Sequence, residues 1–159
     1  MKSTFKRVLL AIAATAVIGF GFTGCQQEAE TEYVYFDITG TWTSPKGAQY
    51  PETYTITSTT FDNGYYSGDN LVIRQVSEDE GYIYIKYTCS MNDDYSYSTT
   101  APDVGKWYAI SYKGLRKNTI QLSGAYKVAG ATSKETLEEA ISEFTIENGY
   151  FDFYSSLLR

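Results

Sequence analysis

The chain of 159 residues contains no histidine. Histidine is the commonest general base at neutral pH and a frequent ligand of zinc and copper, so Ser-His and Cys-His nucleophile pairs and most such metal sites are excluded. The acidic runs at 78–80 and 93–94 lie in polar stretches typical of solvated loops. The body of the chain has no phosphate-binding glycine loop or dinucleotide fingerprint. We therefore expect no enzymatic activity, no metal ion and no cofactor.

Basic residues are also scarce, because 13 Lys and Arg stand against 19 Asp and Glu, for a net charge of −6. Three of the basic residues lie within the first seven positions, and without them the net charge is about −9. A chain of this sign repels nucleic-acid phosphates and anionic lipid head groups, and no basic patch opposes the repulsion. We expect no nucleic-acid partner, and any membrane attachment must come from something other than charge.

Cysteine is scarce as well, and one of the two cysteines, Cys25, follows a segment with the features of an export signal. Residues 1–7 carry three positive charges, and residues 8–22 form an uncharged apolar run of 15 residues, shorter than the ~20 that span a bilayer. Two small residues then precede the cysteine. This order resembles the lipobox of bacterial lipoproteins, in which the cysteine is acylated and becomes the N-terminus, although Phe22 stands where leucine is usual.

The lipobox resemblance implies a signal peptide at 1–24, a lipidated cysteine with an acidic tether at 25–36, and a domain at 37–159. Acyl chains on Cys25 would hold the protein on the lipid bilayer without charge, since each buried methylene contributes about 0.8 kcal/mol. Gln26 follows the cysteine, and the absence of aspartate there favours the outer membrane in the familiar sorting rule. We predict a lipid-anchored protein of the bacterial cell envelope, at the outer membrane.

The second cysteine, Cys89, has no intramolecular partner if Cys25 is acylated. Two interpretations follow, a half-buried strand residue that behaves as a small hydrophobe and a reactive or intermolecular thiol. The first is favoured, because Cys89 ends a run of alternating apolar and polar residues.

Proline is the remaining scarce residue, with three, whereas the chain has 16 tyrosines and 8 phenylalanines. Aromatic residues and threonine suit a half-buried pleated surface, and period-2 alternation of apolar residues predicts antiparallel strands. Asn63-Gly64 and the acidic run at 77–80 separate neighbouring strands as hairpin loops. Seven or eight short strands are expected, at 37–44, 52–61, 70–76, 81–89, 106–114, 118–128 and 150–155, with a hairpin at 61–66.

One amphipathic helix is predicted at 132–144, near the C-terminus. Thr132 and Glu135 have the spacing of a capping box, and apolar residues at i, i+3, i+4 and i+7 from Leu137 form one stripe. The fold class is therefore all-β, mainly antiparallel, with this one helix. A closed up-and-down barrel is favoured because closure removes exposed strand edges, and a β-sandwich is the alternative.

The triplet Gly40-Thr41-Trp42 in the first predicted strand is similar to the Gly-X-Trp of lipocalins and related barrels, in which the tryptophan closes one end of the barrel. Together with the lipobox and the helix, the order of elements over 37–155 resembles bacterial lipocalin-like lipoproteins. The resemblance implies that a basic residue near the last strands packs on Trp42, and Arg116 and Lys127 are the candidates. A divergent lipocalin-like barrel and an unrelated small β-fold both remain open, since the helix is followed by a further predicted strand.

Tyrosines on or beside the strands are the candidate binding residues, because each joins an apolar ring to a hydrogen-bonding hydroxyl. If the barrel holds a cavity, they line a site for a small apolar ligand. If the barrel is filled, they form a surface for a protein or glycan, as in an envelope inhibitor or adhesin; ordinary β-surface is the third interpretation. The tyrosines that suggest a site are Tyr65, Tyr66, Tyr82, Tyr84, Tyr95, Tyr97, Tyr108 and Tyr112, and of these Tyr82, Tyr84, Tyr108 and Tyr112 are the predicted ligand or partner surface.

Overall fold

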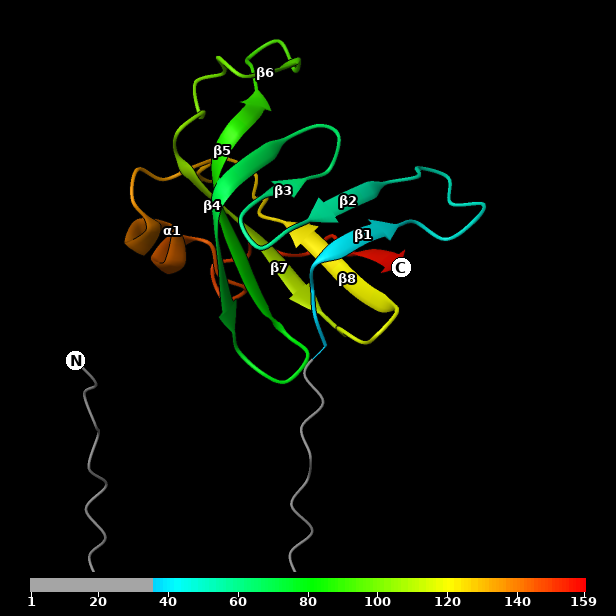
Figure 1. Ribbon diagram of the computed structural model, residues 1–159. Coiled ribbons are helices and arrows are strands. Elements are labelled where there is room, and N and C mark those ends of the chain that lie inside the picture. The colour runs from blue at the N-terminus through cyan, green and yellow to red at the C-terminus, as the bar shows by residue number, and fades with distance from the viewer. Residues whose placement is uncertain (1–35) are drawn as a thin grey trace, which may run out of the picture. The chain divides into compact units, whose positions relative to one another are not determined.

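The computed structural model describes residues 36–159 (Figure 1). The predicted signal peptide, Cys25 and nearly all of the predicted tether lie outside the described residues. The elements are β1 (Gly40–Thr43), β2 (Thr53–Ile56), β3 (Phe61–Asp62), β4 (Ser67–Gln75), β5 (Gly81–Met91), β6 (Tyr97–Ser98), β7 (Trp107–Lys113), β8 (Thr119–Gly124), α1 (Leu137–Glu143) and β9 (Ser155–Leu158).

Eight of these strands form a closed antiparallel barrel, in the order β1, β2, β3, β4, β5, β7, β8 and β9. The pairing of β4 with β5 completes the ring, and β9 meets β1 at the single pair Thr43–Leu158. The ninth strand, β6, pairs only with the end of β5, which projects beyond the barrel (Figure 1). The predicted all-β class is confirmed, and the chain forms a barrel rather than a sandwich.

Period-2 alternation along the strands determines which side chains fill the barrel. On β5, Ile83 and Ile85 face the interior, where Ile83 lies opposite Ile110 and Ile85 lies opposite Tyr108 of β7. Burying each such side chain stabilises the fold by roughly 1.5–3 kcal/mol. The interior also contains the buried residues Trp42, Tyr54, Ile56, Phe61, Ile120, Leu122 and Leu157.

Three predicted strands differ clearly from the structure, and the one predicted at 118–128 ends already at Gly124. The run at 52–61 is interrupted, because the Oγ1 atom of Thr57 accepts hydrogen bonds from the backbone N–H groups of Thr59 and Thr60 and so holds a turn between β2 and β3. The strand predicted at 150–155 is wrong, since β9 begins only at Ser155. The two phenylalanines of this segment, predicted to share a face, differ: Phe151 is buried and Phe153 is exposed.

Helix α1 is shorter than predicted and starts later. Its N-cap is Thr136, whose side chain accepts from the N–H of Glu139, while the Glu139 carboxylate accepts from the Thr136 N–H. The predicted capping box of Thr132 and Glu135 is therefore wrong. The reason is that Lys134 forms a backbone bridge with Trp107 of β7, so the chain is extended just before the helix.

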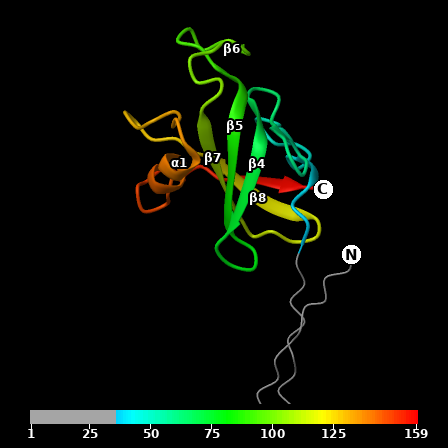
Figure 2. The ribbon, with the colours of Figure 1, turned by 60° about the vertical axis from the view of Figure 1, so that its left-hand side comes forward.

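Helix α1 and the segment that follows it cover the outer wall of β5 and β7 (Figure 2). The ring of Tyr82 on this wall lies 5.6 Å from that of Phe151, and the hydroxyls of Ser111 and Tyr154 are 2.9 Å apart. Within residues 36–159, no helix is both long enough and apolar enough to cross a membrane.

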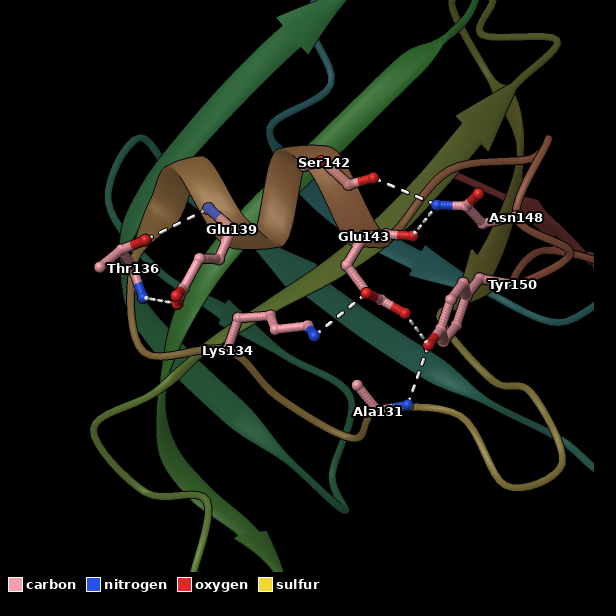
Figure 3. A network of polar contacts seen from close by, with 8 residues as sticks. All are labelled: Ala131, Lys134, Thr136, Glu139, Ser142, Glu143, Asn148 and Tyr150. Atoms are coloured by element: carbon pink, nitrogen blue, oxygen red, sulfur yellow. Dashed lines mark hydrogen bonds and ion pairs between the residues drawn. The ribbon is translucent and has the colours of Figure 1, made fainter.

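A polar network fixes the connection between β8 and β9 (Figure 3). The Tyr150 hydroxyl donates to the Glu143 carboxylate and accepts from the N–H of Ala131, and Lys134 Nζ lies 3.0 Å from Glu143. The Tyr150 hydrogen bond, followed by Lys134, lowers the pKa of Glu143. The Asn148 amide donates to two carbonyls at the C-terminal end of α1. The connection is thereby held in one conformation beside the barrel.

Candidate functional site

Trp42, which is 0% exposed, closes one end of the barrel, called here the sealed end. Its Nε1–H donates to the carbonyl of Ile38 at 2.8 Å, and the Arg159 guanidinium lies 4.1 Å above the ring. Arg159 also donates to the carbonyl of Asp37 at 2.6 Å. Gly40 has φ +135°, and a Cβ there would meet Arg159 at 3.7 Å. The Gly-X-Trp motif therefore gives the backbone the conformation that this contact needs.

The basic residue on Trp42 is Arg159, and the two candidates from the sequence are wrong. Arg116 forms an ion pair with Asp79 at 2.8 Å, beside the β4–β5 loop. Lys127 lies 5.5 Å from the centre of the Tyr150 ring. The sequence does contain a signal for this contact. Arg159 directly follows the apolar residues of β9, the strand that pairs with β1 where the barrel closes.

The opposite end, called the mouth, is open and contains a cleft of about 560 Å³. Strand β7 runs from Tyr108 at the mouth to the β7–β8 loop at the sealed end, where the Arg159 N–H donates to Asn118. The volume is in the range of small-molecule sites. The cleft is lined by Tyr66, Tyr87, Ser90, Met91, Asn92, Asp93, Tyr95, Tyr97, Pro102, Asp103, Tyr108, Ala125, Tyr126, Lys127, Ala131 and Thr132.

Three tyrosines form the base of the cleft. The rings of Tyr87 and Tyr108 are stacked with centres 4.8 Å apart, and Tyr66 meets Tyr108 edge-on at 5.3 Å. The Tyr108 hydroxyl donates to the carbonyl of Ala125 at 3.1 Å. A Cβ on Gly124 would lie 2.5 Å from the Tyr108 hydroxyl and 3.1 Å from that of Tyr66, so the hydroxyls converge where glycine leaves room. The base separates the cleft from the aliphatic interior of the barrel.

Burial raises the pKa of Tyr66, Tyr87 and Tyr108 above the ordinary value near 10. As the pH rises past about 10, the unfolded chain releases these protons while the folded barrel keeps them, so the free energy of unfolding is expected to fall. Urea unfolding at a series of alkaline pH values measures this decrease. Tyr87→Phe, which removes one of the hydroxyls, should show a shallower decrease than the wild type; a free energy independent of pH above 10 would contradict the expectation.

Exposed tyrosine rings and one methionine form the rim of the cleft. Tyr95, Tyr97 and Met91 come from the hairpin of β5 and β6, and Tyr126 follows β8. Tyr95 is 79% exposed and has φ +65°, and Ala129, in the loop after Tyr126, has φ +58°. Left-handed backbone at a residue with a side chain costs about 1 kcal/mol or more and occurs disproportionately at functional sites. Two of the three such residues in the described chain thus lie in loops that border the cleft.

The cleft also contains charged and polar side chains. Asp103 is engaged, because it accepts from the Ser133 hydroxyl at 2.7 Å and lies 3.8 Å from Lys106 Nζ. Within residues 36–159, the side chains of Asp93 and Thr132 make neither an ion pair nor a side-chain hydrogen bond. These two groups are therefore available to a ligand.

The four tyrosines predicted as one surface lie on two sides of the barrel wall. Tyr82 and Tyr84 face outward beneath the covering segment, and Tyr84 is 1% exposed. Tyr108 and Tyr112 face the interior and are buried, and of the four only Tyr108 lines the cleft. The four residues therefore do not form one contiguous surface, and Tyr108 is the one that lines the mouth cleft.

Two cleft tyrosines, Tyr87 and Tyr126, were absent from the predicted set. Tyr87 shares its strand face with Ile83 and Ile85, and Tyr126 follows the alternation of Ile120 and Leu122, so the pattern predicts core positions. Their role depends on where the barrel ends, which alternation along one strand does not specify.

A smaller cleft of about 290 Å³ lies on the outer wall between β5, β7 and the segment after α1. Its apolar lining comes from Val76, Tyr82, Ile146, Phe151 and Tyr154. No group of three or more acidic or cysteine side chains suitable for a metal ion occurs in the described part of the chain.

The fold and the two ends together define a small antiparallel barrel with one sealed end and one tyrosine-lined mouth. No protein-family model, curated protein or solved structure matches this chain.

Proposed function

We propose that the barrel binds a small ligand in the cleft at its mouth. The observation that carries the proposal is the convergence of six tyrosines from separate segments around about 560 Å³, above a base of hydrogen-bonded rings. Small-molecule sites combine aromatic lining with a few placed polar groups, and Asp93 and Thr132 supply such groups here.

The proposal places the ligand at the mouth rather than deep in the barrel. The interior positions are occupied by large buried side chains, among them Trp42, Phe61 and Ile110. None of these lines either of the two clefts described above. An apolar ligand inside the barrel would have to displace close-packed side chains, which is costly.

A lipocalin-like origin and a lipid anchor are part of the same proposal. The closed eight-stranded barrel and the packing of Arg159 on Trp42 support the lipocalin resemblance. The order of charge, apolar run, small residues and Cys25 supports an anchor at the outer membrane of a bacterial envelope. We propose a non-enzymatic, membrane-anchored binding protein.

Native mass spectrometry tests the ligand proposal. The full chain, incubated with a small-molecule extract of the cells that produce it, is expected to carry a bound species. Thr132→Trp should abolish this species, because Thr132 is exposed and lines the cleft, so that an indole there occupies the ligand volume without disturbing the core.

Thr59→Trp is the matched control. Thr59 is exposed in the turn between β2 and β3 and does not line the cleft. This variant should retain the bound species at wild-type occupancy. Equal occupancy in both variants, or no bound species in the wild type, would contradict binding at the mouth.

An interaction protein of the envelope is the second candidate, favoured by exposed ring pairs that extend beyond the cleft. Tyr65 lies 5.6 Å from Tyr97, and Tyr126 lies 6.3 Å from Phe153. Rings of this kind are enriched at protein interfaces. Under this alternative, pull-down of an envelope protein would be lost in Tyr65→Ala and Phe153→Ala and retained in Thr132→Trp.

A further inference from the structure

We propose that the ligand of the mouth cleft is a neutral oligosaccharide, an inference that rests on the cleft being a ligand site. The first ground is the chemistry of the lining. The cleft contains no leucine, isoleucine, valine, phenylalanine or tryptophan, and each of its six aromatic rings ends in a hydroxyl. Its aliphatic lining is limited to Met91, Pro102, Ala125 and Ala131.

This lining favours a ligand that has both apolar faces and hydroxyl groups. An alkyl chain over Asp93 and the tyrosine hydroxyls would take them out of water without returning hydrogen bonds, which opposes binding. A sugar ring presents C–H groups on its faces and hydroxyls around its edge. The faces pack on aromatic rings, and the edge hydroxyls donate to Asp93 and exchange hydrogen bonds with Thr132.

The charge of the cleft favours a neutral oligosaccharide over an anionic one. Asp103 already has Ser133 and Lys106 as partners, and Lys127 lies over the Tyr150 ring. Asp93 therefore remains as a carboxylate without an ion-pair partner in the part of the chain that the structure describes. An anionic sugar would be repelled by Asp93 and by the net charge of −6 of the whole chain.

The rim supplies the stacking surfaces. Tyr95 and Tyr126 are 79% and 60% exposed and come from different loops, so both rings present surface to a ligand in the cleft. Tyr95 also adopts left-handed backbone, with φ +65°, a strained conformation of the kind found disproportionately at functional sites. A sugar-binding role thus accounts for the exposure of both rings and for the strained backbone at Tyr95.

Saturation-transfer NMR and calorimetry on the full chain, in a detergent without a sugar head group, test the proposal. The probes are the tetrasaccharides of the malto, cello, manno and chito series, the anionic tetragalacturonate, and palmitate as the apolar probe. At least one neutral tetrasaccharide is expected to bind. Its affinity should fall about tenfold in Tyr95→Ala and in Tyr126→Ala. Tyr50→Ala should bind like the wild type, since Tyr50 is 78% exposed and lies outside the cleft.

Each other outcome overturns a defined part of the proposal. Palmitate binding that depends on Tyr95 and Tyr126, without saccharide binding, overturns the saccharide and leaves the ligand site in place. Tetragalacturonate binding more tightly than the neutral probes overturns neutrality. Saccharide binding unaffected in both cleft variants overturns the site, and absence of binding by every probe overturns the site and the saccharide together.

Discussion

Trp42→Ala is expected to destabilise the barrel by about 3–5 kcal/mol, the range for truncating a large buried aromatic side chain. Trp42 is fully buried, donates to the carbonyl of Ile38, and lies beneath the guanidinium of Arg159. The truncation leaves a cavity at the sealed end and an unpaired carbonyl. Urea unfolding followed by far-UV circular dichroism measures the loss, and a midpoint like that of the wild type would rule out this role for Trp42.

A double-mutant cycle separates the contact with Arg159 from the packing of the ring. Arg159→Ala alone should cost about 1 kcal/mol, the size of an exposed cation–π contact together with a lost hydrogen bond. In the Trp42→Ala background the same change should cost less, because the ring is already gone. If the losses of unfolding free energy in the two single variants simply add up in the double variant, the guanidinium is held by Asp37 and not by the indole.

Cys25→Ser is expected to move the protein from the membrane fraction to the soluble fraction. If acyl chains on Cys25 are the anchor, serine removes the thioether that carries them, and an acidic chain has no electrostatic attraction to the bilayer in its place. Fractionation followed by immunodetection measures the change, which should be nearly complete.

Cys89→Ser is the matched control for this experiment. Cys89 is partly exposed, and its thiol contacts only the carbonyl of Tyr65 at 3.7 Å among the hydrogen bonds of the described residues. The variant should fold and remain with the membrane. Retention of Cys25→Ser in the membrane after an alkaline carbonate wash would show that another feature attaches the protein.

The strands that were predictable are those with one clear buried face. Ile83 and Ile85 alternate with polar or aromatic neighbours, and Ile120 and Leu122 do the same, so β5 and β8 follow from the residues alone. Asn63-Gly64 also marks its hairpin, because Gly64 adopts φ +83° there.

The features that escaped prediction depend on contacts between distant segments. Lys134 pairs with Trp107 and thereby delays the start of α1, and the Tyr126 N–H donates to the carbonyl of Tyr150, a contact between segments far apart in the sequence. Arg159 reaches Trp42 only because the barrel closes. The residues of the mouth cleft were predictable only in part for the same reason. Tyr66, Tyr95, Tyr97 and Tyr108 were among the candidate tyrosines, but the six rings come from five separate stretches of sequence that only the closed barrel brings together.

The chain enters the barrel at the sealed end, where Asp37 and Ile38 hold Arg159 and Trp42. The cleft lies at the other end of the barrel, beyond the length of β7. The barrel therefore has a polarity, with the entry of the chain at Asp37 and the mouth cleft at opposite ends. If the domain is coupled to a bead or a sensor surface through the chain before Asp37, the mouth cleft therefore faces the solution.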